Sequence, residues 1–169
     1  MTDAAHTVVI GLGNPLMADD GIGLVALERL AGDWDLGDGI ELVDGGTWGM
    51  NLLPLLEASD DVIFLDAIRT GAAPGTVVTL EREELPRGLM LKMSPHQIDL
   101  REVLALLALR GTLPARLVAL GIAPDRVEMS TALSAVAEAA LPALLQRVTA
   151  LLAERGHHCQ PRSAAPCTS

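Results

Sequence analysis

Aromatic side chains are almost missing from this chain of 169 residues, which has no tyrosine, two tryptophans and one phenylalanine. Half of the residues are nevertheless hydrophobic. The core must therefore be built from aliphatic side chains that pack by shape, and the apolar share is too high for a mostly disordered chain. Proteins that bind single-stranded nucleic acids stack the bases on aromatic rings, so the shortage argues against that class of partner.

Basic residues are also scarce, with 12 Lys and Arg against 22 Asp and Glu and a formal net charge of −10. Phosphate backbones attract basic proteins, so we expect no nucleic-acid partner. No uninterrupted apolar run reaches the length of about 18 residues that a membrane span requires, so we expect no span. No basic segment precedes the apolar run at 8–12, and we therefore expect no secretory signal.

Cysteine occurs only twice, as Cys159 and Cys167. Two cysteines near the C-terminus are not a disulfide framework, and the expected compartment is the cytoplasm. The sequence after Gly156 reads HHCQPRSAAPCTS and predicts a disordered tail over 157–169. A metal site formed by His157, His158 and Cys159 is an alternative for this tail. The length predicts a single domain over 1–156.

Apolar runs alternate with helical patterns along the body of the chain. Strands are predicted at 8–12, 40–43, 62–65, 76–80 and 117–122. Apolar residues recur at helical spacing over 22–30, 49–58, 98–107 and 133–152. Pro142 is expected to kink the last helix or to mark a restart. The alternation predicts an α/β fold with a mostly parallel sheet.

Acidic residues follow the first three predicted strands. Asp19 and Asp20 follow the first, Asp44 the second and Asp66 the third. The carboxyl ends of parallel strands lie at one edge of a sheet, where open α/β folds bind ligands. Carboxylates gathered there repel one another unless a cation lies between them. His96 is the one histidine inside the predicted body, and two carboxylates with an imidazole suit a divalent transition metal.

Each of these residues also has a structural interpretation. Asp19 or Asp20 could stabilise a helix N-terminus, and spacing alone does not separate the two. Asp44 could be a turn residue, and a lone histidine is commonly structural. The loop at 11–16 begins like a dinucleotide-binding motif, but Leu16 stands where the motif needs glycine and acids follow it. We therefore expect no nucleotide or flavin cofactor.

Several sequence blocks occur in an order that resembles the hydrogenase maturation proteases. These endopeptidases trim the C-terminus of the large subunit of nickel–iron hydrogenases. The resemblance spans about 8–155 and implies a three-layer α/β/α sandwich around a twisted sheet of about five strands. The blocks are GLGNPLMADDGIG at 11–23, DGGTWGMNLL at 44–53, VIFLDAI at 62–68, APGT at 73–76, SPHQIDLREVL at 94–104 and LVALGIAP at 117–124.

The resemblance also implies a site and a mechanism. The metal ligands, which double as the catalytic residues, would be Asp20, Asp66 and His96. Aligning the GLGN and GIG segments selects Asp20 over Asp19. The substrate-binding residues would be Asp44, Gly45, Gly46 and Thr47. The implied activity is that of a monomeric, metal-dependent, aspartyl-type endopeptidase. Its substrate would be the nickel-loaded precursor of the large subunit, with nickel as the recognition element.

Two other functions fit part of the pattern. A nickel-binding assembly factor for hydrogenase could use the same three ligands without hydrolysis. Peptidyl-tRNA hydrolases also end their first strand in Gly-Leu-Gly-Asn-Pro, but their Thr-Arg-His-Asn block is missing here and the net charge of −10 is unsuited to tRNA. The body contains no His-Glu-x-x-His helix and no Ser-His-Asp or Cys-His arrangement.

Overall fold

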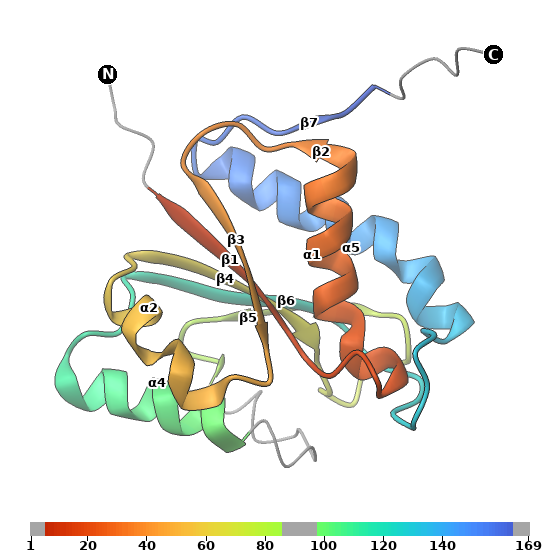
Figure 1. The fold of residues 1–169 in the computed structure, drawn as a ribbon, viewed down its shortest axis with the longest axis horizontal. Helices are drawn as coiled ribbons and strands as arrows, with labels where there is room; N and C mark the ends of the chain where they lie inside the picture. The colour runs from red at the N-terminus through yellow and green to blue at the C-terminus, as the bar shows by residue number, and fades with distance from the viewer. Residues whose placement is uncertain (1–5, 86–97, 164–169) are drawn as a thin grey trace.

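The computed structural model describes residues 6–85 and 98–163 (Figure 1). His96 and Cys167 lie outside the described residues. The elements run in the order β1 (Thr7–Leu12), η1 (Ala18–Gly21), α1 (Ile22–Asp33), β2 (Trp34–Asp35), β3 (Ile40–Gly46), η2 (Gly49–Leu52), α2 (Leu53–Glu57), β4 (Asp61–Ala67), β5 (Val77–Glu81), α4 (Ile98–Arg110), β6 (Arg116–Ile122), α5 (Ala135–Glu154) and β7 (Gln160–Pro161).

The central sheet has five strands in the order β3-β1-β4-β6-β5. The first four are parallel, and β5 pairs antiparallel with β6. Every residue of β4 is buried, as expected for a central parallel strand covered on both faces by helices. The predicted α/β class, the mostly parallel sheet and its five strands are confirmed.

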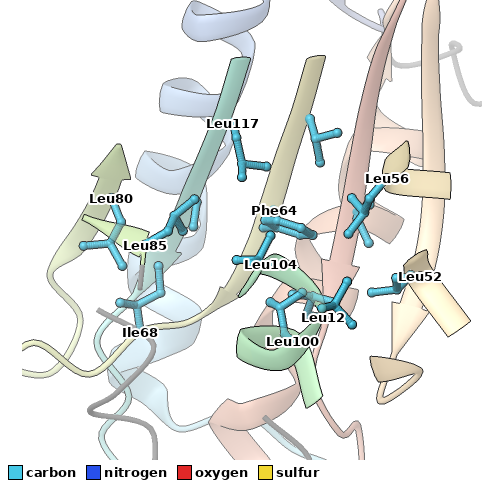
Figure 2. Close-up of a cluster of buried hydrophobic side chains, with 14 of the residues drawn as sticks. Leu12, Leu52, Leu56, Phe64, Ile68, Leu80, Leu85, Leu100, Leu104 and Leu117 are labelled. Carbon is cyan, nitrogen blue, oxygen red and sulfur yellow. The ribbon is translucent and has the colours of Figure 1, made fainter. Parts of the chain in front are cut away.

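Helices cover both faces of the sheet and separate two aliphatic cores (Figure 1). On one face, Val9 and Ile63 contribute to a core shared with α1 and α5. On the other, Phe64 lies among leucines from η2, α2 and α4 (Figure 2). Successive strand residues point to opposite faces, which is why neighbours such as Ile63 and Phe64 enter different cores. The three-layer arrangement is confirmed, and Phe64 is the sole phenylalanine in a core that is otherwise aliphatic.

The last long helix, α5, continues through Pro142 as one element. A helix restart at this proline, one of the two outcomes the sequence predicts, is therefore wrong. Leu141 and Leu144 beside the proline are buried against the sheet, and this tertiary packing outweighs the hydrogen bond that proline cannot donate. By length and composition α5 could cross a membrane, but its buried stripe belongs to the core of the sandwich.

The C-terminal segment differs from the predicted tail over residues 157–163. The backbone N–H of His157 donates to the carbonyl of Leu152 at 3.0 Å, and β7 pairs with β2 in a small antiparallel sheet. The N–H of Arg162 donates to the carbonyl of Asp33 at 2.8 Å. Asp33 and β2 lie far away in sequence from this segment, so its local composition contained no sign of them.

A buried polar network occupies the amino-terminal ends of β1 and β4. Asp61 is fully buried, and its carboxylate accepts a hydrogen bond from the Thr7 hydroxyl at 2.9 Å. The same carboxylate pairs with the guanidinium groups of Arg116, at 2.8 Å, and Arg155. Thr7 uses its proton on Asp61, so the Nε2–H of His157 donates to the Thr7 oxygen at 2.7 Å. This network anchors the segment after α5 to the sheet.

Candidate functional site

The loop between β1 and η1 brings Asp20 back over the end of β1. Gly13 has a φ of 120°, and a Cβ there would lie 1.8 Å from the carbonyl oxygen of Asp20. Only glycine fits so tight a turn. The Asp20 side chain is 6% exposed, and its Oδ2 accepts the backbone N–H of Asn14 at 2.9 Å. This hydrogen bond orients the carboxylate.

Asp66 lies at the carboxyl end of β4, on the adjacent strand. It is 3% exposed, and its Oδ1 accepts the N–H of Ala67 at 2.7 Å. A Cβ on Gly23 would lie 2.1 Å from the carbonyl oxygen of Leu65, so the start of α1 packs directly on the end of β4. The η1 segment that carries Asp20 contacts β4 as well. The structure therefore brings Asp20 and Asp66 to the same part of the sheet edge.

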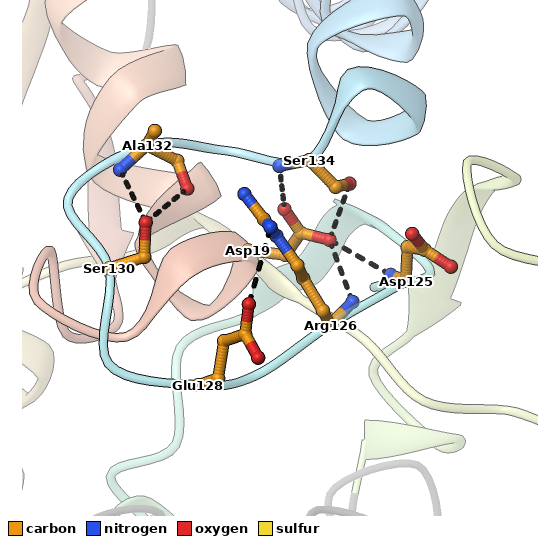
Figure 3. A network of polar contacts seen from close by, with 7 residues as sticks. All are labelled: Asp19, Asp125, Arg126, Glu128, Ser130, Ala132 and Ser134. Carbon is orange, nitrogen blue, oxygen red and sulfur yellow. Dashed lines mark hydrogen bonds and ion pairs between the residues drawn. The ribbon is translucent and has the colours of Figure 1, made fainter.

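Asp19, the neighbour of Asp20, has a different environment (Figure 3). Its Oδ1 accepts the N–H of Ser134 at 2.7 Å, and its Oδ2 accepts the Ser134 hydroxyl at 2.8 Å. Oδ2 also accepts the N–H groups of Asp125 at 2.9 Å and Arg126 at 3.1 Å. Burial favours the protonated acid, but these hydrogen bonds outweigh it and hold the pKa of Asp19 below its usual value. We call these four residues the Asp19 clasp.

The clasp explains how the chain tolerates an unfavourable backbone conformation just before the two acids. Ala18 has a φ of 50°, a left-handed conformation that costs a residue with a Cβ roughly 1–2 kcal/mol. Its N–H donates to the carbonyl of Ser130 at 2.8 Å, and the clasp fixes the same loop from Asp19. Asp19 therefore serves the fold, and Asp20 stays the candidate ligand of the pair.

The predicted substrate-binding block forms one side of a pocket of about 340 Å³ beside Asp20. The loop after β1 forms the other side, and the N–H of Gly13 joins the two by donating to the carbonyl of Gly46 at 3.0 Å. Asp44 and Thr47 are exposed, whereas Gly45 is buried against Ile10. The pocket lining includes Gly13, Asn14, Asp44, Gly46, Thr47 and Trp48.

Asp44 is set apart from the other two acids. It lies on β3, and β1 separates β3 from β4. Neighbouring strands are about 4.8 Å apart, so Asp44 and Asp66 are on strands roughly 10 Å apart. Asp44 therefore belongs to the pocket and lies apart from Asp66.

Within residues 6–85 and 98–163, no three His, Cys, Asp or Glu side chains are grouped so as to hold a metal ion. The third predicted ligand, His96, lies outside these ranges, so the described part of the site contains two carboxylates. Carboxylate oxygens bind divalent cations and also act as general bases. In the C-terminal segment, where the sequence offered His157 as a metal ligand, its Nε2–H donates a hydrogen bond to the Thr7 hydroxyl oxygen.

Several residues of this region were not predicted from the sequence, among them Asn14, Trp48 and Ser134. Asn14 and Trp48 line the pocket, and Ser134 completes the Asp19 clasp. Ser134 precedes α5 and accepts the N–H of Ala137 at 3.1 Å, so a serine before a helical pattern was the available signal for a capping role. No local signal could show that the same hydroxyl donates to Asp19, because 115 positions separate them.

A family model described as hydrogenase maturation protease matches residues 25–151. The hydrogenase 2 maturation protease of Escherichia coli K12 is 39% identical over 158 residues, which cover 93% of this chain and 96% of that protein. The hydrogenase expression/formation protein HupM of Azotobacter chroococcum mcd 1 is 38% identical over 159 residues, 93% of this chain and 76% of the relative.

Solved structures of hydrogenase maturation proteases are also similar to this chain. The hydrogenase maturating endopeptidase HybD from E. coli superposes with a TM-score of 0.88 at 37% identity, over 95% of this chain and 99% of that one. The NiFe hydrogenase maturation protease HybD from Thermococcus kodakarensis superposes with a TM-score of 0.71 at 27% identity, over 87% and 99%.

Proposed function

The chain belongs to the hydrogenase maturation protease family, and from this premise we propose that it removes the C-terminal extension of the nickel-loaded large-subunit precursor of a nickel–iron hydrogenase. It is a hydrolase that acts on peptide bonds. We further propose that it works in the cytoplasm as a monomer, through one catalytic domain to which the segment 157–163 also packs.

The proposed recognition element is the nickel that the precursor already carries. Asp20, Asp66 and His96 would complete the coordination of that ion when the precursor docks. Two carboxylate oxygens and an imidazole nitrogen form a donor set that divalent transition metals accept, with positions left for ligands from the substrate. A precursor without nickel would lack the group that these side chains recognise.

The observation that carries this proposal is the shared location of Asp20 and Asp66. Both are more than nine-tenths buried at one part of the carboxyl edge, and a backbone N–H orients each carboxylate. Burial of two acids at one place is costly unless a cation or a proton is shared between them. The Asp19 clasp supports the choice of Asp20, because four hydrogen bonds to Asp19 give that neighbouring acid a structural role.

The pocket beside Asp20 supports a role for its lining residues Asp44, Gly46 and Thr47 in holding the substrate polypeptide, and the buried Gly45 would only shape the loop. Asn14 lines this pocket and also donates its backbone N–H to Asp20. A substrate segment in the pocket would therefore pass directly beside the proposed ligand.

Two routes to hydrolysis are open to these residues. In the first, which gives the aspartyl-type assignment, Asp20 or Asp66 takes the proton from the attacking water and so acts as a general base. In the second, Asp20, Asp66 and His96 would hold the precursor's nickel, which would supply Lewis-acid chemistry at the scissile carbonyl.

The test compares nickel-loaded and nickel-free precursor from the organism that encodes this chain. Cleavage is followed by the change in gel mobility of the large subunit. We expect the loaded precursor to be cut and the nickel-free precursor to remain intact. Equal cleavage of both forms would refute recognition through nickel, and binding of nickel without any cleavage would favour an assembly factor instead.

A further inference from the structure

Two large apolar side chains are exposed on the loops that form the pocket beside Asp20. Trp48 lines the pocket and is 57% exposed, and Leu16 follows the lining residue Pro15 and is 59% exposed. Four large hydrophobic residues are at least this exposed within the described ranges, and these two lie on the loops that form one pocket. An exposed tryptophan that lines a pocket offers a large apolar surface to a bound polypeptide.

The backbone holds both residues in fixed positions. The N–H of Trp48 donates to the carbonyl of Gly45 at 2.9 Å, and the N–H of Asn51 donates to the carbonyl of Trp48 at 3.0 Å. The N–H of Leu16 donates to Oδ1 of Asn14 at 3.0 Å. Apolar side chains on rigid loops lose little conformational freedom on binding, which is typical of residues that anchor an interface.

We propose that Leu16 and Trp48 form a docking surface for an apolar side chain of the precursor polypeptide, next to the bond that is cut. This docking surface presupposes the proposed function and would bind the substrate polypeptide. An endopeptidase has to hold a polypeptide beside its reacting groups, and this surface adjoins the pocket whose Asn14 holds Asp20. The net charge of −10 disfavours a nucleic acid as the occupant.

The kinetic test uses Trp48→Ala with nickel-loaded precursor. We expect KM to rise at least about tenfold while kcat stays near that of the wild type, because the lost contact is made equally before and during the reaction. Leu109→Ala is the matched control, since Leu109 is 85% exposed on α4 and lies away from the pocket. Its KM should stay within twofold. A KM within twofold for Trp48→Ala would overturn the proposal.

A second measurement needs no substitution at position 48. Protease labelled with 5-fluorotryptophan gives two ¹⁹F signals, from Trp34 and Trp48, and Trp34→Phe assigns them. With Asp20→Asn blocking turnover, nickel-loaded precursor that co-elutes with this variant in gel filtration should shift the Trp48 signal and leave that of Trp34 in place. A Trp48 signal that keeps its position would overturn the docking surface. The role of nickel is judged separately, by whether the wild type cuts nickel-free precursor.

Discussion

Buried acids lie at both ends of the central sheet, but their surroundings differ. At the amino-terminal ends of the strands, Asp61 pairs with Arg116 and Arg155 and accepts the Thr7 hydroxyl. At the carboxyl ends, Asp20 and Asp66 accept backbone N–H groups from Asn14 and Ala67. Guanidinium groups neutralise the Asp61 carboxylate, and the backbone amides orient the carboxylates of Asp20 and Asp66.

This contrast distinguishes Asp61, which stabilises the fold, from Asp20 and Asp66, the candidate catalytic acids. A buried ion pair resists change, because removing one partner leaves the other charged and desolvated. A carboxylate oriented by an amide keeps the negative charge that a cation or a proton requires. Asp19 shows that the carboxyl edge also contains a structural acid, recognisable because both its oxygens accept hydrogen bonds from the loop before α5.

Removing Asp61 should produce the largest loss of stability. Asp61→Ala leaves the guanidinium of Arg155, whose side chain is 10% exposed, without its carboxylate. We expect the free energy of unfolding to fall by about 3–5 kcal/mol, measured by chemical denaturation. Asp33→Ala is the control, since its surface ion pair with Arg29 should contribute less than about 1 kcal/mol. A loss below about 1 kcal/mol at Asp61 would contradict a stabilising role.

Asp19→Ala should come next, with a loss of about 3 kcal/mol as several N–H groups of the clasp lose their acceptor. The contribution should depend on pH. The folded pKa of Asp19 lies below its ordinary value, so its stabilisation is full above about pH 4 and is lost as the pH falls through the folded pKa. Denaturation of both proteins between pH 3 and pH 7, roughly, measures this, and parallel pH curves would contradict the clasp.

Asp20→Asn should affect activity and spare the fold. The amide oxygen of asparagine can still accept the Asn14 N–H, but the negative charge is gone. We expect processing of nickel-loaded precursor to slow at least about a hundredfold, equivalent to about 2.7 kcal/mol, with stability changed by less than about 1 kcal/mol. The exposed Asp60→Asn should process normally. Normal processing by Asp20→Asn would remove Asp20 from the site.

The smallest effect should come from His157. Burial lowers the pKa of His157, outweighing the opposite influence of Asp61. As the pH falls below about 6.5, the unfolded chain takes up a proton that the folded chain refuses. Stability should therefore fall toward acid, at no more than about 1.4 kcal/mol per pH unit. His157→Gln should flatten this slope between about pH 5 and pH 7, and the exposed His158→Gln should leave it unchanged.

Local patterns were sufficient to predict the five strands and the position of Asp66. The apolar run VIFL at 62–65 is followed directly by Asp66. A continuous apolar run is typical of a central parallel strand, and the residue that follows it then lies near the carboxyl edge of the sheet. The pocket was predicted in part, because Asp44 and its glycines follow a strand, whereas Trp48 carries no local sign of exposure. The role of His96 stays a prediction, since that residue lies outside the described ranges.

The sequence by itself determined the α/β class, the aliphatic cores and the order of acids along the strands, because these follow from periodicity and composition. Only the tertiary structure separated Asp19 from Asp20. Both are buried, and they differ in whether Ser134, more than a hundred positions away, donates to their oxygens. The tertiary structure also brought His157 into hydrogen-bond contact with Thr7, which in turn donates to Asp61. Hydrogen bonds between distant segments depend on how the chain folds back on itself. A local sequence pattern therefore does not show which distant residues will be partners.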